Sequence, residues 1–331
     1  MEYVYGPVPS RRLGFSLGVD IVPYKACTLD CIYCQLGRTT RKVIKRKPYT
    51  PKEEIFKEIG IFLNKLINID FITFSGSGEP TLHSEIGALI KGVKKITSIP
   101  VAVLTNGTLL FMKDVQKDLL EADVVLPSLD AASQHVFKRI NRPHNSLNIE
   151  SIINGLKGFR KIFSGQIWLE IMLIQGYNDD SKELLQIKKA LSEIQPDKIH
   201  LNTVIRPPSE KYASPLNPDE MRAARDLLGE SCEIIAEFHG KGYVGNRDLK
   251  GAIIEMTKRR PVTIIDIANV FGISEANAEK LVEMLKAKKK LKEIQHKEKK
   301  YYTLIIAEYK DIQERVATTV EIRRGPNDFK I

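Results

Sequence analysis

Strand-length apolar runs alternate with longer segments of helical periodicity through the first two thirds of this chain. The runs cover residues 17–22, 70–75, 101–105, 123–126, 167–174 and 198–203. The helical segments between them cover residues 51–66, 84–97, 110–120, 147–163 and 181–194, with Thr50 and Pro51 as an N-cap and first helical residue. Strands that alternate with helices form parallel sheets covered by helices. We therefore expect an α/β fold, a partial TIM-like barrel of six βα units with its chemistry at the carboxyl ends of the strands.

Three cysteines lie on one short loop directly after the first apolar run. Cys27, Cys31 and Cys34 have the spacing C-x3-C-x2-C, and Tyr33 precedes the third cysteine. Three thiolates are one fewer than a closed tetrahedral zinc site or a fully protein-ligated cubane requires. The pattern favours a [4Fe–4S] cluster whose fourth iron stays open to a small molecule.

The remaining cysteine and the composition help to judge three alternatives: a zinc site, a disulfide framework, and a membrane or secreted protein. A zinc knuckle would need a fourth ligand, and His83 and Cys232 are the only distant candidates. With only four cysteines in 331 residues, a disulfide framework is not expected, which favours a reducing compartment. No apolar run reaches the length of a membrane span, and residues 1–5 do not resemble a secretory signal. We expect a cytoplasmic protein without a membrane partner.

Polar residues follow the other predicted strands. The second strand leads into Gly76-Ser77-Gly78-Glu79-Pro80, where glycines allow the backbone to approach a ligand closely and Glu79 offers a carboxylate. The later strands end near Asn106, Ser128, Asp130, Gln175 and Asn178. Such residues also serve as helix caps and Asx-turns at βα junctions, which is the alternative interpretation of each.

The cysteine loop followed by this glycine-rich turn resembles the radical S-adenosylmethionine (SAM) superfamily. Gly78-Glu79-Pro80 matches its GGEP motif, with Ser77 in place of the first glycine. The resemblance implies a [4Fe–4S] cluster on Cys27, Cys31 and Cys34. It also implies an electron donor such as flavodoxin or ferredoxin, and reductive cleavage of SAM to a 5′-deoxyadenosyl radical. The residues that it places near SAM are Tyr33, Gly76, Gly78, Glu79, Asn106, Ser128, Asp130, Gln175 and Asn178.

Three further segments look most like short members of this superfamily related to 4-demethylwyosine synthase, a tRNA-modifying enzyme. They are residues 6–12, residues 22–25 and the stretch Cys34-Gln35-Leu36-Gly37. That enzyme family carries a second cluster on three more cysteines, whereas this chain has only Cys232 to spare. A second cluster is therefore not expected, and neither is methylthio transfer.

Other charged residues are candidates for contact with the substrate. Glu170 lies in an otherwise apolar predicted strand and should meet a cation in the barrel mouth, and Arg206 could hold a carboxylate or phosphate bidentately. Residues 35–50 contain six basic residues and no acid, among them Arg38, Arg41 and Lys42. A surface ion pair or a solvated face is the alternative for each of these.

Residues after 249 change in character. Helical patterns at 249–258, 264–271 and 274–288, then strand-like runs at 291–295 and 300–305, predict a winged helix. Such a module binds nucleic acid or a peptide, and residues 280–300 hold nine lysines against three glutamates. We expect three parts: a barrel at 1–245, a winged helix at 246–306 and a tail at 307–331 with one helix.

Two function hypotheses follow, both for a radical SAM enzyme. In the first the substrate is RNA, in particular tRNA, which fits a net charge of +10 from 51 basic and 41 acidic residues. In the second it is a protein or peptide docked on the winged helix. A metal-bearing regulator that binds nucleic acid is a more remote alternative. The sequence assigns no catalytic residue and no oligomeric state.

Overall fold

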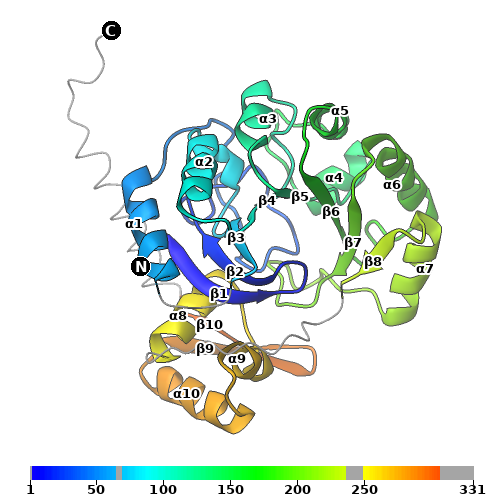
Figure 1. Cartoon of the computed structure of the whole chain (residues 1–331). Coiled ribbons are helices and arrows are strands. Elements are labelled where there is room, and N and C mark those ends of the chain that lie inside the picture. Colours follow the sequence, from blue (N-terminus) through cyan, green and yellow to red (C-terminus); the bar gives the residue numbers. More distant parts are fainter. Residues whose placement is uncertain (1, 65–68, 236–248, 306–331) are drawn as a thin grey trace.

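An eight-stranded sheet forms the centre of the protein. The structure is a computed structural model that describes residues 2–64, 69–235 and 249–305. The strands lie in chain order: β1 (Val4–Ser10), β2 (Gly14–Val19), β3 (Phe71–Phe74), β4 (Val101–Thr105), β5 (Val124–Pro127), β6 (Gln166–Leu173), β7 (Lys198–Thr203) and β8 (Cys232–Ile234). β1 and β2 are antiparallel, and every later neighbouring pair is parallel. The sheet curves into an open arc (Figure 1), and within the described residues its edge strands β1 and β8 do not pair.

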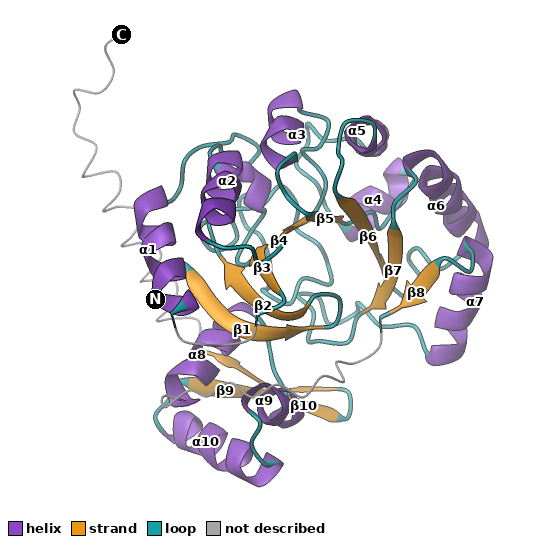
Figure 2. Ribbon diagram, in the orientation of Figure 1, coloured by secondary structure: helices purple, strands orange, loops and turns teal. Residues whose placement is uncertain are grey.

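Helices cover the outside of this arc (Figure 2). They are α1 (Lys52–Leu63), the short 3-10 helix η1 (Pro80–Leu82), α2 (Ile86–Ile96), α3 (Lys113–Leu119), α4 (Gln134–Ile140), α5 (Ile149–Arg160), α6 (Ser181–Ile194) and α7 (Pro218–Leu228). Helix α2 shows why they pack there: Ile86, Leu89, Ile90 and Val93 recur at helical spacing and are fully buried. One large hydrophobic core thus lies between the helices and the sheet.

The predicted α/β alternation is confirmed, with additions. All six predicted strands and all five predicted helices form near their expected positions. Strand β1 was not predicted because Gly6, Pro7 and Pro9 interrupt its pattern, and prolines are tolerated on an edge strand such as this one. β8, α4 and α7 were also not predicted, and β8 is only three residues long. The predicted cap was wrong: Pro51 is the N-cap of α1, and the Thr50 hydroxyl donates to the Ile21 carbonyl instead.

The turn between β1 and β2 fills part of the interior of the arc. Leu13, in this turn, packs with Ala102, Val124, Leu126 and Trp168 in a small apolar cluster separate from the main core. These partners come from β4, β5 and β6. The inner side of the sheet is therefore closed off by the chain's own hairpin.

The C-terminal unit consists of three helices and two antiparallel strands. The elements are α8 (Leu249–Arg259), α9 (Ile264–Phe271), α10 (Glu275–Ala287), β9 (Leu291–His296) and β10 (Lys299–Leu304). They follow the predicted order and enclose a hydrophobic cluster of their own, against which Val8 and Tyr24 of the first unit pack. The Tyr301 hydroxyl donates to the Ile205 carbonyl at 2.9 Å. The predicted tail at 307–331 lies outside the described residues.

In the part of the chain that the structure describes, none of the helices combines the length and apolar character that crossing a membrane requires.

Candidate active site

The cysteine loop lies between β2 and α1 and is anchored from both sides. Leu29 and Ile32 are buried between the cysteines. The Asp30 amide donates to the Asn141 carbonyl at 3.0 Å, and the Ile32 amide donates to the Ile140 carbonyl at 2.9 Å. These bonds join the loop to the end of α4, an element that the sequence pattern did not predict. The positions of the cysteines are therefore set by packing and by main-chain hydrogen bonds.

Each cysteine sulfur has a side-chain nitrogen donor beside it. The three pairs are Lys25 Nζ with Cys34 Sγ at 3.1 Å, Asn106 Nδ2 with Cys27 Sγ at 3.6 Å, and Asn141 Nδ2 with Cys31 Sγ at 3.4 Å. Burial alone would lower the pKa of Lys25, but the neighbouring thiols, Cys34 above all, raise it. The surroundings thus offer positive charge and N–H groups, which favour thiolate sulfur.

Two of the three thiols, those of Cys27 and Cys31, hold their protons when nothing is bound to them. Burial, followed by the charge of Glu79, raises the pKa of Cys27 to about 11. Burial, followed by the charge of Asp130, raises the pKa of Cys31 well above its usual value. A metal that binds here must therefore displace protons from at least these two thiols.

The two candidates for a fourth zinc ligand are engaged elsewhere in the fold. Among the described residues, no three His, Cys, Asp or Glu side chains are grouped closely enough to hold a single metal ion. The two ring nitrogens of His83 face the Thr50 and Glu85 amides at 3.3 and 3.2 Å, and Cys232 is buried in β8, so neither residue completes a zinc site.

The glycine-rich loop after β3 packs directly against the cysteine loop. The amide of Ser77 donates to Asp20 Oδ1 at 3.1 Å, and its hydroxyl donates to Asp20 Oδ2 at 2.5 Å. A Cβ atom at Gly76, where φ is +146°, would lie 2.4 Å from the Asp20 carboxyl carbon. A Cβ atom at Gly78 would lie 2.1 Å from the Ala26 carbonyl oxygen. Both glycines are thus needed for the close approach of the two loops, and Asp20 explains why serine fits at 77.

Glu79 is buried and fixes the relative position of the ends of β3 and β4. Its Oε1 accepts from the amide and hydroxyl of Thr81, at 3.0 and 2.6 Å, and from the Thr105 hydroxyl at 2.6 Å. Its Oε2 accepts from the Asn106 amide at 2.7 Å. Burial raises the pKa of Glu79, and these hydrogen bonds oppose the rise. Glu79 therefore acts first as a support for the loop.

Asp130 and Asn178 also tie strand ends together. Asp130 accepts from the Tyr33 hydroxyl at 2.5 Å, from Asn141 Nδ2 at 2.7 Å and from the Met172 amide at 2.9 Å. Asn178 donates to the carbonyls of Asp130 and Met172, both at 2.8 Å. Both are buried. The polar atoms of both residues bind the protein, and Asp130 positions Tyr33 on the cysteine loop. Contact of Asp130 and Asn178 with SAM stays a prediction.

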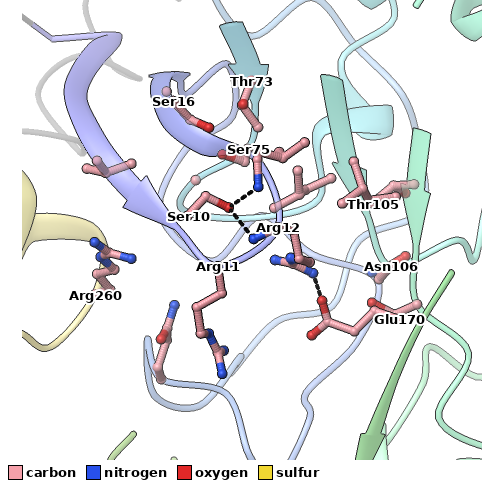
Figure 3. A pocket seen from close by; sticks show the side chains of 18 of the residues that line it. Ser10, Arg11, Arg12, Ser16, Thr73, Ser75, Thr105, Asn106, Glu170 and Arg260 are labelled. Carbon is pink, nitrogen blue, oxygen red and sulfur yellow. Dashed lines mark hydrogen bonds and ion pairs between the residues drawn. The ribbon is translucent and has the colours of Figure 1, made fainter. Parts of the chain in front are cut away.

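A cavity of about 340 Å³ opens between these loops and the interior of the sheet (Figure 3). Among the predicted residues it is lined by Cys27, Gly76, Gly78, Glu79, Asn106, Ser128, Glu170 and Arg206. An adjoining cavity of about 310 Å³ is lined by Cys27, Cys34, Tyr33 and Lys25, among others. Most of the predicted cofactor residues therefore do meet around one space.

Glu170 meets the cation that its position in an apolar strand predicts. The carboxylate pairs with the Arg12 guanidinium and also accepts from Asn202 Nδ2 at 3.1 Å (Figure 3). Arg12 comes from the turn between β1 and β2, so the hairpin that closes the interior also supplies the charge. The pair is mostly shielded from solvent, with 19% and 12% of the two side chains exposed.

Several predicted residues lie away from both cavities. Gln175 is exposed and its Nε2 donates to Glu220 at 3.3 Å. The Arg38 side chain is 66% exposed and lies 3.5 Å from Glu210, and Arg41 and Lys42 line neither cavity. The later part of the basic run is structural, because Arg46 is nearly buried between Asp114 and Asp118. Contact of Arg38, Arg41 and Lys42 with the substrate therefore stays a prediction, and it would have to occur outside these two cavities.

The family follows from the match between this site and a known sequence profile. The profile described as the Radical SAM superfamily matches residues 21–187, which include the cysteine loop, the glycine-rich loop and the ends of β4 to β6. The chain belongs to the radical SAM superfamily. It is therefore an enzyme of a superfamily whose members use a [4Fe–4S] cluster and SAM.

Relatives in the superfamily differ in length and name. A UPF0026 protein of Methanocaldococcus jannaschii is 34% identical over 284 residues, which are 83% of this chain and 88% of that protein. A protein of Brachyspira hyodysenteriae named GTPase Obg is 39% identical over 294 residues, 88% of this chain. The present chain spans only 43% of that protein. A GTP 3′,8-cyclase of Lactiplantibacillus plantarum is 28% identical over 162 residues, 46% of this chain and 45% of that enzyme.

The residues of this radical SAM protein fit its cofactors. A cubane held by three cysteines leaves its fourth iron open, and Cys27, Cys31 and Cys34 supply three thiols from one loop. The nitrogen donors beside each sulfur match the hydrogen bonds that tune such clusters. The cavity beside Cys27 provides space for a small molecule at the open iron.

The structure also adds site residues that sequence reasoning missed. These are Arg12, Asp20, Lys25, Asn141 and Arg260. Lys25 lies two residues before the first cysteine, and the Arg11-Arg12 pair precedes an otherwise apolar turn, so a signal existed for both. Asn141 and Arg260 become neighbours of the site only through the fold.

Proposed function

We propose that this radical SAM enzyme cleaves SAM reductively at a cluster on Cys27, Cys31 and Cys34 and uses the resulting radical to modify RNA, specifically tRNA. The observation that carries the proposal is the convergence of the cysteine loop, through Cys27 and Cys34, and the glycine-rich loop on adjoining cavities lined by several arginines. When bound, the cluster and SAM supply one-electron cleavage of a carbon–sulfur bond and a 5′-deoxyadenosyl radical, which abstracts hydrogen from the substrate.

The chain's own residues would hold, orient and shield these reactants. Asn106 joins the loops, because its amide donates to Glu79 and its side chain donates to Thr28 at 2.8 Å and toward Cys27. The glycine-rich backbone and Ser128 would then contact SAM along the wall of the cavity. The hairpin turn around Leu13 keeps water from entering through the sheet interior.

The C-terminal unit supports an RNA substrate in this proposal. We assign residues 246–306 as a winged helix next to the barrel at 1–245, in line with three helices followed by a hairpin. Exposed lysines on it could contact phosphates: Lys280, Lys288, Lys289, Lys292 and Lys297. Lys286 and Lys300 contribute less, since both pair with Glu293.

The proposal also covers the related enzyme group, the electron donor and the location in the cell. The chain would stand near the 4-demethylwyosine synthase group but work with a single cluster, since Cys232 is buried in β8 away from the cavities. The similarity to a GTP 3′,8-cyclase agrees with a phosphate-bearing substrate. A flavodoxin or ferredoxin would deliver the electron, and the cytoplasm is the proposed location.

The test is anaerobic reconstitution of the full chain, followed by incubation with SAM, dithionite and total tRNA. We expect 5′-deoxyadenosine and a change in the nucleoside mass spectrum, both absent for Cys31→Ala, which loses one iron ligand. Binding of tRNA should weaken steeply with salt, because each phosphate contact releases counterions. Cleavage of SAM with unchanged nucleosides and no salt-dependent binding would refute the RNA substrate and favour the peptide hypothesis.

A further inference from the structure

Four arginines from three distant parts of the sequence line the same cavity. Arg11 and Arg12 come from the turn between β1 and β2, Arg206 follows β7, and Arg260 follows α8 of the C-terminal unit. In Figure 3, Arg260 lies at the left, Arg11 extends from the hairpin turn, and Arg12 lies between them and Asn106, where it pairs with Glu170. The arginines therefore face the space in which SAM and its substrate would meet.

The charges of these arginines oppose one another. Burial, followed by the charges of Arg11 and Arg206, lowers the pKa of Arg12 to about 9. Burial, followed by Arg206, lowers the pKa of Arg260 to about 9. With a pKa of about 9, Arg12 and Arg260 still carry a charge at neutral pH. Like charges gathered at a partly buried site cost free energy unless an anion compensates them.

The carboxylates around the cavity compensate only part of this charge. Glu170 is committed to Arg12, and Glu79 is already bound by Thr81, Thr105 and the Asn106 amide. Four arginines thus face two carboxylates along the lining. Asp266, in α9, raises the pKa of Arg260 from outside the cavity lining. Among the described residues that line the cavity, cationic side chains outnumber carboxylates, which would favour an anionic ligand.

Two buried hydroxyls show that the cavity is built for a polar ligand. Ser16 Oγ and Thr73 Oγ1 line it, both residues are 3% exposed, and neither oxygen has a hydrogen-bond partner in the structure. A buried hydroxyl without a partner costs about 1–3 kcal/mol, which a ligand with donors or acceptors would relieve. The orphaned hydroxyls and the arginines line the same space.

We propose that Arg11, Arg206 and Arg260 form a phosphate-binding subsite for the substrate, with Arg12 held in place beside it by Glu170. A phosphate offers three oxygens to donors that converge from separate directions, whereas one arginine suffices for a carboxylate. The identity of the phosphate-bearing substrate rests on the proposed function, but anion binding at this subsite does not.

The subsite would couple substrate binding to the contact between the two units. Arg260 belongs to the C-terminal unit, while Arg11 and Arg206 belong to the first unit. Arg11 and Arg206 also line a second cavity of about 360 Å³ against α9, α10 and β10. A phosphate bound by all three arginines therefore bridges the units, and the rest of the substrate can extend along this second cavity.

The experiment measures binding of pyrophosphate to the reconstituted full-length enzyme by calorimetry at low salt. Arg206→Gln and Arg260→Gln should each weaken binding about 10-fold or more, because each loses a hydrogen bond between charged groups. Arg222→Gln is the matched control, since Arg222 is exposed on α7 beside Asp219. Circular dichroism and melting temperature identify variants that do not fold; if Arg260→Gln fails, Arg206→Gln and Arg11→Gln carry the test.

Two further arms identify the source of the phosphate. Tight binding of GTP compared with guanosine indicates a nucleotide, and tight, salt-sensitive binding of tRNA indicates an RNA backbone; either supports the subsite. No pyrophosphate binding at about 10 mM, or equal binding by all variants, overturns it. So does a loss of SAM affinity in Arg206→Gln without phosphate binding, which would assign the arginines to the SAM carboxylate. Formation of 5′-deoxyadenosine is measured separately, so failure of the subsite and failure of the proposed function remain distinguishable.

Discussion

The ion pair between Arg12 and Glu170 offers a quantitative test of how the hairpin turn is held. We consider Glu170→Gln, which preserves the shape of the side chain and an acceptor for Asn202 but removes the charge. Arg12 then stays in place with most of its surface covered, next to Arg11 and Arg206, and without its counter-ion. The variant should therefore be less stable than the wild type.

The magnitude follows from burial. Removing one partner of a buried ion pair costs about 3–5 kcal/mol. Because 19% of Arg12 and 12% of Glu170 are exposed, the low end of about 3 kcal/mol applies. In a domain of this size each kcal/mol shifts the melting temperature by about 2–4 °C, so we expect a decrease of about 6–12 °C.

The assay is differential scanning fluorimetry of the cluster-free chain in a double-mutant cycle. Arg12→Met should destabilise similarly, because it leaves the Glu170 anion unpaired. The loss of unfolding free energy in the double variant should be about 3 kcal/mol smaller than the sum of the losses in the two single variants. Glu193→Gln, in the exposed pair with Lys157, is the control and should leave the melting temperature unchanged. A melting temperature that falls by less than about 2 °C in Glu170→Gln would refute the reasoning. So would a double variant whose loss of stability equals the sum of the two single losses.

Three other predictions concern the loops, the pH and the cluster. Gly78→Ala places a Cβ atom 2.1 Å from the Ala26 carbonyl oxygen, so we expect the loops to separate and iron incorporation to fall, as measured by iron and sulfide analysis. Burial lowers the pKa of His83 and of His200 to about 4 in the folded chain, against about 6.5 in the unfolded chain. Between these pH values the unfolded chain therefore binds more protons than the folded chain. The contribution of these histidines to the free energy of unfolding should be fully present above pH 6.5. At pH 5 each histidine should have lost about 2 kcal/mol of it, which the melting temperature would report. Cys31→Ala should abolish the brown colour and the visible absorbance of the iron–sulfur cluster in the anaerobically reconstituted protein.

Each of these has a result that would contradict it. Full iron incorporation in Gly78→Ala would show that the loops tolerate the extra carbon. An unchanged pH profile in His200→Phe, compared with the wild type, would mean that His200 is not the titrating group. Tightly bound zinc with no iron or sulfide in the wild-type protein would exclude the cluster.

The sequence predicts those features that depend on local pattern. Strands β4 and β7 and helix α6 fall where the apolar periodicity places them, because their hydrophobic faces define their limits. The cysteine loop and Glu79 carry spacing motifs and are brought together as expected. Glu170 could be expected to meet a cation, since a buried carboxylate needs one.

The features that sequence could not predict depend on long-range contacts. Nothing local indicates that Arg12 reaches β6, since the turn at 11–13 must first cross the interior of the sheet. Asp130 looked like a ligand contact, but the tertiary fold places Tyr33 and Asn141 around it and uses its oxygens. Arg260 joins the cavity only because the C-terminal unit packs against the first.

The position of Leu13 also has a consequence for synthesis on the ribosome. Leu13 packs on Trp168, which is made about 155 residues later, or roughly 8–30 s later at typical elongation rates. During that time the nascent hairpin can pair its own two strands, but its tip has no place to dock. The earliest part of the polypeptide to emerge is thus among the last to reach its native environment, and chaperones have that interval in which to engage it.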